Sequence, residues 1–99
     1  MVRHVVLYQL KPEATPDDLG KLLRSLTDIP EVSELSCGTN SSPLGLAGEW
    51  VYGLYVSFRD EAARHRYMTN PRHLAVAAAV EALIESLLVF GITTEEVLA

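Results

Sequence analysis

Hydrophobic and polar positions alternate over the first residues of the chain, and this period of two predicts a β-strand from Val2 to Leu10. One face of that strand carries His4 among apolar and aromatic residues, while Val5 and Leu7 lie on the other face. The same alternation predicts a strand from Trp50 to Phe58. Since each strand has apolar residues on both faces, we expect both faces of their sheet to be covered.

Two helices are predicted from start signals in which a capping side chain precedes a proline. Thr15 with Pro16, and Asn70 with Pro71, place an N-cap before a proline at the first helical position. The first helix, which ends near residues 28–30, has one apolar stripe made of Leu19, Leu22, Leu23 and Leu26.

Among the remaining elements, the strand near residues 32–39 has the weakest pattern. Asp60 is predicted to cap a short helix that ends near Thr69, and the helix after it carries apolar residues as far as Ile84. Strands are expected near Val32 to Thr39 and from Leu87 to Ile92. Residues 40–48 have the composition of a loop, and residues 93–99 that of a short acidic tail.

The order of these elements is β-α-β-β-α-β, with the second helical unit broken into two pieces. This predicts an α+β, ferredoxin-like fold, in which a four-stranded antiparallel sheet has helices on one face. A chain of 99 residues forms one domain, spanning 1–99. No helices remain to cover the other face, which carries Val5, Leu7, Val51 and Tyr55. A second copy of the chain is the simplest cover, so a homodimer is expected.

The charge and composition of the chain argue against several classes of function. The net charge of −5 and the scattered basic residues argue against binding to nucleic acid or to anionic lipid. No apolar run reaches the roughly 18 residues of a membrane span, and the alternating N-terminal segment is unlike a signal peptide. Cys37 is the single cysteine, which leaves neither an intrachain disulfide nor a cysteine-based zinc site. A cytoplasmic protein is therefore expected.

Two segments of the chain, RHVVLYQLKP at residues 3–12 and YMTNPRH at residues 67–73, resemble landmarks of the stress-responsive dimeric α/β-barrel family. The first segment resembles the family's opening strand, with a basic residue and a histidine before an aliphatic run and a lysine. The second segment resembles its second landmark, Tyr-x-x-[His/Asn]-Pro-x-His. The resemblance covers nearly the whole chain. It implies a dimer in which two sheets face each other and form a barrel.

Within that family the chain is similar to polyketide cyclases of the olivetolic acid cyclase type, which close a linear polyketide by an aldol reaction. The resemblance implies that His4, Tyr67 and His73 match their catalytic histidine, tyrosine and histidine. The chain departs from that enzyme at three positions, where a tyrosine, a histidine and an indole are replaced by Leu26, Asn70 and Ile84. The identity of the substrate therefore does not carry over.

The chemistry of these three side chains also suggests proton transfer, independently of the family resemblance. His73 falls in the first turn of a helix, where the positive end of the dipole disfavours imidazolium, so a neutral imidazole can act as a general base. Tyr67 can donate to a developing enolate oxygen. Each residue also has a purely structural alternative. In these alternatives His4 is simply a buried histidine, His73 packs at the start of its helix, and Tyr67 is an amphipathic residue of the core. His4 and His73 have no carboxylate or cysteine at ligand spacing, so neither a metal nor another cofactor is expected.

The sequence leaves three functions open. The first is a cofactor-free enzyme acting on a small, apolar carbonyl compound, possibly a polyketide cyclase with His/Tyr acid–base chemistry. The second is a non-enzymatic stress-response dimer that binds a hydrophobic ligand, and the third is a cofactor-independent monooxygenase. For each, we expect a pocket between sheet and helices that contains the three candidate catalytic residues and four substrate-binding residues, Val6, Tyr8, Leu22 and Leu26.

Overall fold

A computed structural model describes residues 1–94 of the chain, and its elements follow the predicted order. The strands are β1 (Val2–Leu10), β2 (Glu34–Thr39), β3 (Tyr52–Phe58) and β4 (Ile84–Thr93). The helices are α1 (Pro16–Arg24), the 3₁₀ turn η1 (Ser25–Asp28), α2 (Glu61–Thr69) and α3 (Pro71–Glu81).

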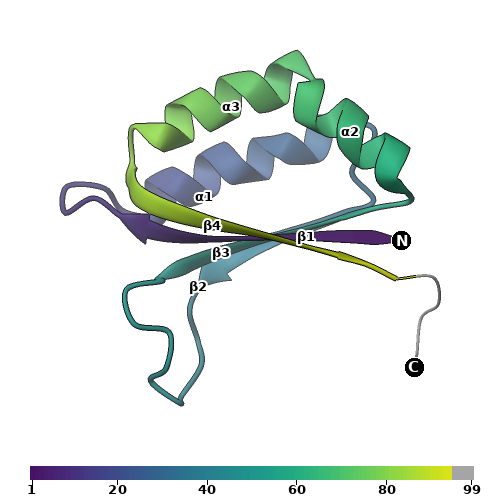
Figure 1. The fold of residues 1–99 in the computed structure, drawn as a ribbon. Helices are drawn as coiled ribbons and strands as arrows, with labels where there is room; N and C mark the ends of the chain where they lie inside the picture. The colour runs from purple at the N-terminus through teal and green to yellow at the C-terminus, as the bar shows by residue number, and fades with distance from the viewer. Residues whose placement is uncertain (95–99) are drawn as a thin grey trace.

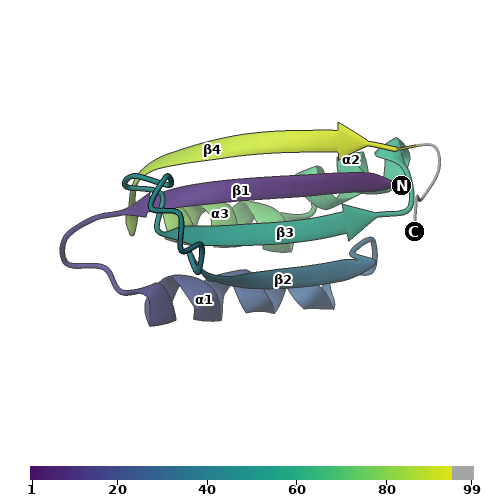
Figure 2. The ribbon, with the colours of Figure 1, turned by 90° about the horizontal axis from the view of Figure 1, so that it is seen from below.

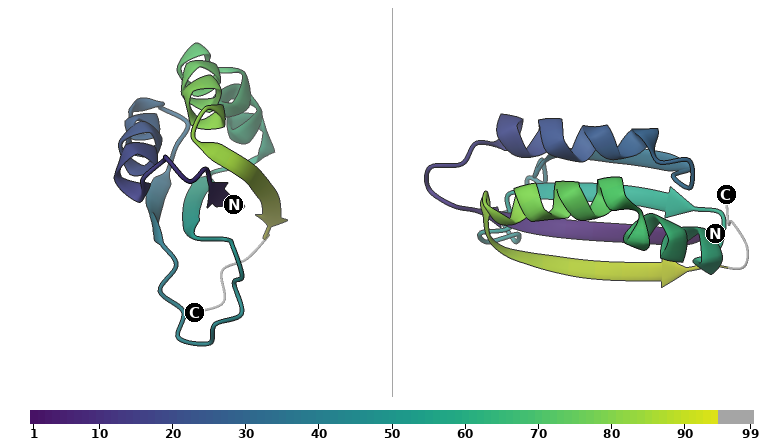
Figure 3. Two further views of the ribbon diagram at one scale, coloured as in Figure 1. Left: turned by 90° about the vertical axis from the view of Figure 1, so that its left-hand side faces the viewer. Right: turned by 90° about the horizontal axis from the view of Figure 1, so that it is seen from above.

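The strands form one antiparallel sheet in the order β2-β3-β1-β4. All three α-helices lie on one side of this sheet, with α1 on the β2 side and α3 beside it (Figures 1 and 3). Seen from below, no helix covers the four strands, the helices lie behind them, and the loop between β2 and β3 crosses in front of one end of the sheet (Figure 2). The predicted ferredoxin-like α+β class is therefore confirmed.

The helices α1, α2 and α3 begin directly after the residues that were predicted to cap them. Each cap oxygen accepts a hydrogen bond from a backbone N–H of the first turn: Thr15 from Asp18 at 3.2 Å, Asp60 from Ala63 at 2.8 Å and Asn70 from Arg72 at 2.8 Å. Because Asn70 ends α2 and caps α3, the chain changes direction there without an intervening loop.

Several predicted boundaries were wrong. α3 ends at Glu81 rather than continuing to Ile84, because the chain turns and the Leu83 N–H bonds to the Val80 carbonyl at 2.9 Å. Ile84 instead begins β4, which therefore starts before the predicted Leu87 and includes Thr93 at its end. β2 and β3 each begin two residues later than predicted, at Glu34 and Tyr52. The remainder of the predicted acidic tail, residues 95–99, lies outside the described residues.

The hydrophobic core lies between the helices and the sheet. Alternate residues of β1 point into it, among them Val2, His4 and Val6, and the two valines belong to one buried cluster with Leu19 and Leu23 of α1. Leu19 and Phe58 have no exposed surface. The period of two in β1 thus sets His4 on the helix side of the sheet, beside the core.

The opposite side of the sheet is apolar and uncovered. Val5 lies opposite Tyr55 and Phe90 on the neighbouring strands, and Leu7 lies opposite Leu88. Directly paired residues share a face, so an apolar surface crosses three strands. We call it the open face: Val5, Leu7, Tyr55, Leu88, Phe90 and Ile92. Val51, which was also expected here, immediately precedes β3 and is exposed.

Within residues 1–94, no helix has the length and apolar character needed to cross a membrane.

Candidate functional site

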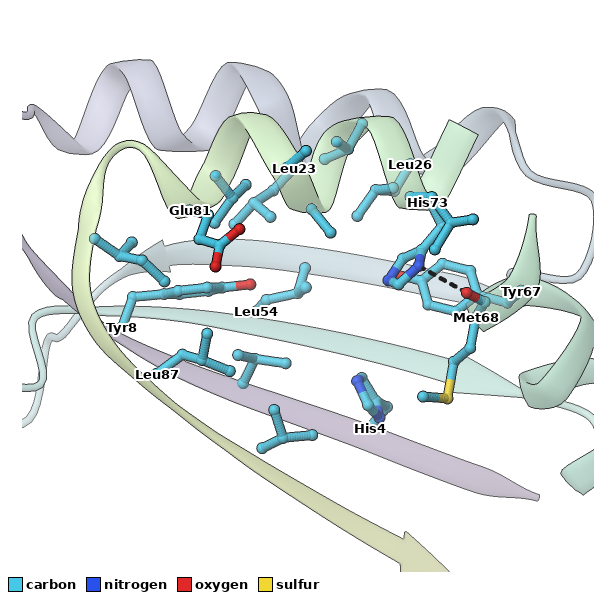
Figure 4. Close-up of a pocket in the computed structure, with 18 residues that line it drawn as sticks. His4, Tyr8, Leu23, Leu26, Leu54, Tyr67, Met68, His73, Glu81 and Leu87 are labelled. Atoms are coloured by element: carbon cyan, nitrogen blue, oxygen red, sulfur yellow. Dashed lines mark hydrogen bonds between the residues drawn. The ribbon is translucent and has the colours of Figure 1, made fainter. Parts of the chain in front are cut away.

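A cavity of about 480 Å³ opens between the helices and the β1–β4 side of the sheet (Figure 4). Its walls are mostly aliphatic side chains from β1, α1, α3 and β4. Two polar regions interrupt these walls: His4, Tyr67 and His73 at one end, and Tyr8 with Glu81 at the other. The volume lies in the range of sites that hold small molecules.

His73 is held by the backbone of the preceding helix. Asn70 and Pro71 start α3 so that His73 falls in its first turn, and its Nδ1 lies 3.2 Å from the Met68 carbonyl oxygen (Figure 4). Since a carbonyl oxygen only accepts, Nδ1 carries the hydrogen and Nε2 keeps its lone pair. Burial lowers the pKa of His73, and the bond to Met68 opposes that shift in part. The imidazole is therefore neutral near pH 7, chiefly because of burial rather than the helix dipole that the sequence suggested.

Tyr67 lies between two other rings. Its ring centroid is 4.8 Å from that of Phe58 and 4.5 Å from that of His73. Burial raises the pKa of Tyr67 to about 12, so the phenol stays protonated. Its hydroxyl has no hydrogen-bond partner within residues 1–94, and every fully enclosed side-chain oxygen and nitrogen there does have one. The hydroxyl therefore reaches open space and can donate to a ligand.

His4 faces the same cavity from the sheet. It is 8% exposed, and its ring meets the edge of Phe58 at a centroid distance of 6.4 Å. Burial is the main cause that lowers the pKa of His4, and the positive charge of Arg64 and the nearby His73 lower it further. Two neutral imidazoles and a protonated phenol thus lie around one end of the cavity.

The structure brings together all the candidate site residues except one. His4, Val6, Tyr8, Leu26, Tyr67 and His73 line the cavity. Leu22 does not line it, and the next residue, Leu23, does. Leu22 is half-buried at the side of the core, because the leucine stripe of α1 is broader than the part of the helix that faces the cavity.

Besides Leu23, the sequence analysis missed several other lining residues, and four of them bear most on the shape and chemistry of the cavity. Leu87 and Val89 come from β4 and form part of its helix-facing side, which could not be assigned while the start of that strand was misplaced. The Met68 side chain extends beside His4 in Figure 4, and Glu81 extends its carboxylate into the far end. An exposed glutamate at a helix end is common, so the sequence held no signal for it. No group of three or more metal-ligating side chains occurs within residues 1–94.

A family model described as the stress responsive A/B barrel domain matches residues 2–93. A comparison with curated proteins finds no match. Among solved structures, a hydroxynitrile lyase from Passiflora edulis superposes with a TM-score of 0.85 and 22% identity, over 99% of this chain and 96% of that one.

Two further structures have similar folds. A dimeric ferredoxin-like protein of unknown function from Jannaschia sp. CCS1 has a TM-score of 0.82 and 20% identity, covering 94% of this chain and 98% of its own. SnoaB, a cofactor-independent oxygenase from Streptomyces nogalater, has a TM-score of 0.76 and 16% identity, covering 98% and 95%. At these identities the likeness establishes a common fold, on which different chemistries can be built.

Proposed function

Because this chain belongs to the stress responsive A/B barrel domain family, we propose that it is a cofactor-free enzyme acting on a small, apolar carbonyl compound. The reaction begins by removing a proton from the carbon next to the carbonyl, as in the aldol closure of a linear polyketide. One observation supports this most directly: His73, Tyr67 and His4 share a single apolar cavity.

In this mechanism His73 is the general base. Its Nδ1 hydrogen is occupied by the Met68 carbonyl, so Nε2 is the atom free to accept the substrate proton. The negative charge then moves to the carbonyl oxygen, which becomes an enolate. The Tyr67 hydroxyl donates to that oxygen, and a ring N–H of His4 provides a second donor. In an aldol closure the enolate carbon then bonds to a second carbonyl carbon of the same substrate, and the alkoxide that forms takes the proton from His73, so no redox partner is needed.

We further propose that the protein works as a homodimer that buries the open face. Val5, Leu7 and Phe90 lie on a surface that no element within residues 1–94 covers. The Jannaschia structure is described as dimeric. Two such sheets packed face to face would form a barrel and leave each cavity on its outer, helix-covered side.

A second candidate is a non-enzymatic protein that binds a hydrophobic ligand. The observation in its favour is the cavity wall, which is aliphatic over most of its area. The two candidates differ in one respect: an enzyme of the proposed type removes a proton from a bound ketone, and a binding protein does not.

Proton removal can be measured without knowing the natural substrate. Decan-2-one is incubated with the protein in D₂O, and deuterium entry beside the carbonyl is followed by NMR. We expect His73→Ala to slow this exchange by roughly 10²–10⁴-fold, the usual contribution of a general base. His65→Ala is the matched control, because His65 is an exposed histidine of α2 outside the cavity.

Binding of the ketone is measured in parallel by calorimetry. Tight binding without exchange above the buffer rate would favour the binding protein over the enzyme. Equal exchange by wild type and His73→Ala would refute the role of His73 as base. Exchange that is lost in both His73→Ala and His65→Ala would point to a general loss of folding.

A further inference from the structure

The cavity has a second polar end, formed by Tyr8 and Glu81. Figure 4 shows the Glu81 carboxylate beside the Tyr8 ring at the end of the cavity opposite His4 and His73, and the Tyr8 hydroxyl points from that end toward the middle of the cavity. Two elements give the spacing of the Cα atoms at the two ends. His4 and Tyr8 are four residues apart on β1, or about 13 Å at strand rise. His73 and Glu81 are eight residues apart on α3, or about 12 Å at helical rise.

The carboxylate of Glu81 does not stabilise the helix that carries it. Glu81 is the last residue of α3, where the helix dipole is negative and disfavours an anion, and the last turn has no basic residue. None of the ion pairs within residues 1–94 includes it. Among the residues that line the cavity in this part of the chain, Glu81 is the single carboxylate. It is therefore available to a ligand.

The Tyr8 hydroxyl is also free to bind. The residue is 4% exposed, yet its hydroxyl has no hydrogen-bond partner within residues 1–94. Since no fully enclosed side-chain oxygen in that range lacks a partner, this hydroxyl opens onto the cavity. Burial raises the pKa of Tyr8, so the phenol keeps its proton and can donate.

We infer that the ligand is an elongated, uncharged hydroxy-carbonyl compound whose hydroxyl end lies between Tyr8 and Glu81. The ligand hydroxyl donates to the Glu81 carboxylate and accepts from the Tyr8 phenol, so each of its hydrogen-bonding roles has one partner. A ligand ending in a carboxylate would be repelled by Glu81 and would leave its charge in a mostly apolar space. The inference takes the position of the carbonyl from the proposed function and adds the chemistry of the opposite end.

Three probes of nearly equal length test the far end: decan-2-one, 10-hydroxydecan-2-one and 9-oxodecanoate. Their affinities for the full chain are measured by isothermal titration calorimetry. We expect the hydroxy ketone to bind best and the keto acid worst. Glu81→Gln should weaken the hydroxy ketone by roughly ten-fold, the worth of one hydrogen bond to a charged group, and should improve the keto acid. Tyr8→Phe should weaken the hydroxy ketone and leave decan-2-one unchanged.

Glu85→Gln is the matched control, because it removes an equal charge four residues away at a position outside the cavity lining. Thermal unfolding checks that each variant is folded. If Glu81→Gln leaves the ranking of the probes unchanged, or if no probe binds, the inference is wrong, even where wild type catalyses deuterium exchange. If the ranking changes as expected but no exchange occurs, the inference stands and the proposed enzymatic function fails.

Discussion

Replacing Phe90 tests the proposed dimer most directly. Phe90 is 55% exposed in the single chain. A phenylalanine covers about 200 Å² when buried, so about 110 Å² of its surface is open to a partner. At about 25 cal/mol per Å², burying this area stabilises the dimer by about 2–3 kcal/mol per subunit, and by about 5 kcal/mol for two symmetric copies. We therefore expect Phe90→Ala to raise the dimer dissociation constant by roughly 10³–10⁴-fold.

The assay is sedimentation velocity over a range of protein concentrations. Leu74→Ala is the matched control, because Leu74 is 56% exposed but lies on α3, on the other side of the sheet. A wild-type protein that stays monomeric at micromolar concentration would refute the dimer. A dimer weakened equally by Phe90→Ala and Leu74→Ala would refute the assignment of the interface to the open face.

Two further predictions concern the histidines. Burial lowers the pKa of His4 and His73 below 6.5, so the unfolded chain binds more protons below that pH and the free energy of unfolding should fall as pH drops through 6.5. Urea denaturation should show a flatter profile for the His4→Gln/His73→Gln double variant, and an unchanged profile would contradict the prediction. A methyl group on Gly91 would lie 2.9 Å from Arg64 Nη1 and push that flexible side chain away. Gly91→Ala should therefore raise the His4 pKa in an NMR titration, whereas a displaced Arg64 with an unmoved pKa would exclude its charge as a cause.

The fold could be predicted because its signals are local. Thr15, Asp60 and Asn70 each satisfy a backbone N–H through a side chain a few residues away, so the sequence alone located three helix starts. The end of α3 could not be located in this way. Residues 80–84 are apolar and suit either a helix or a strand, and the choice depends on a tertiary contact, the 3.0 Å bond from the Lys11 N–H to the Leu83 carbonyl.

For the candidate site too, the features set by local sequence were predicted and those set by tertiary contacts were not. The alternation of β1 placed His4 with Val6 and Tyr8 on the helix side, which the structure bears out. Leu22 and Leu23 occupy one stripe, and which of them faces the cavity depends on how α1 sits against α3. The place of Glu81 in the cavity depends on where α3 ends and on the path of β4. Neither the end of α3 nor the path of β4 is determined by a few neighbouring residues, so the far end of the cavity was not predicted.

The sequence of β4 has a consequence for folding. Residues 87–90 are all large and apolar, so a slip of one residue along β1 would still place apolar side chains on both faces. The hydrophobic pattern, which usually sets the register of strand pairing, therefore does little to select one register between β4 and β1. Gly91 adds one further signal, because a Cβ at that position would lie 2.9 Å from the Arg64 guanidinium. A slipped strand would bring the larger Phe90 or Ile92 to that place. Either side chain would displace the Arg64 guanidinium and disturb its 3.1 Å ion pair with Glu61, which disfavours the wrong alignment.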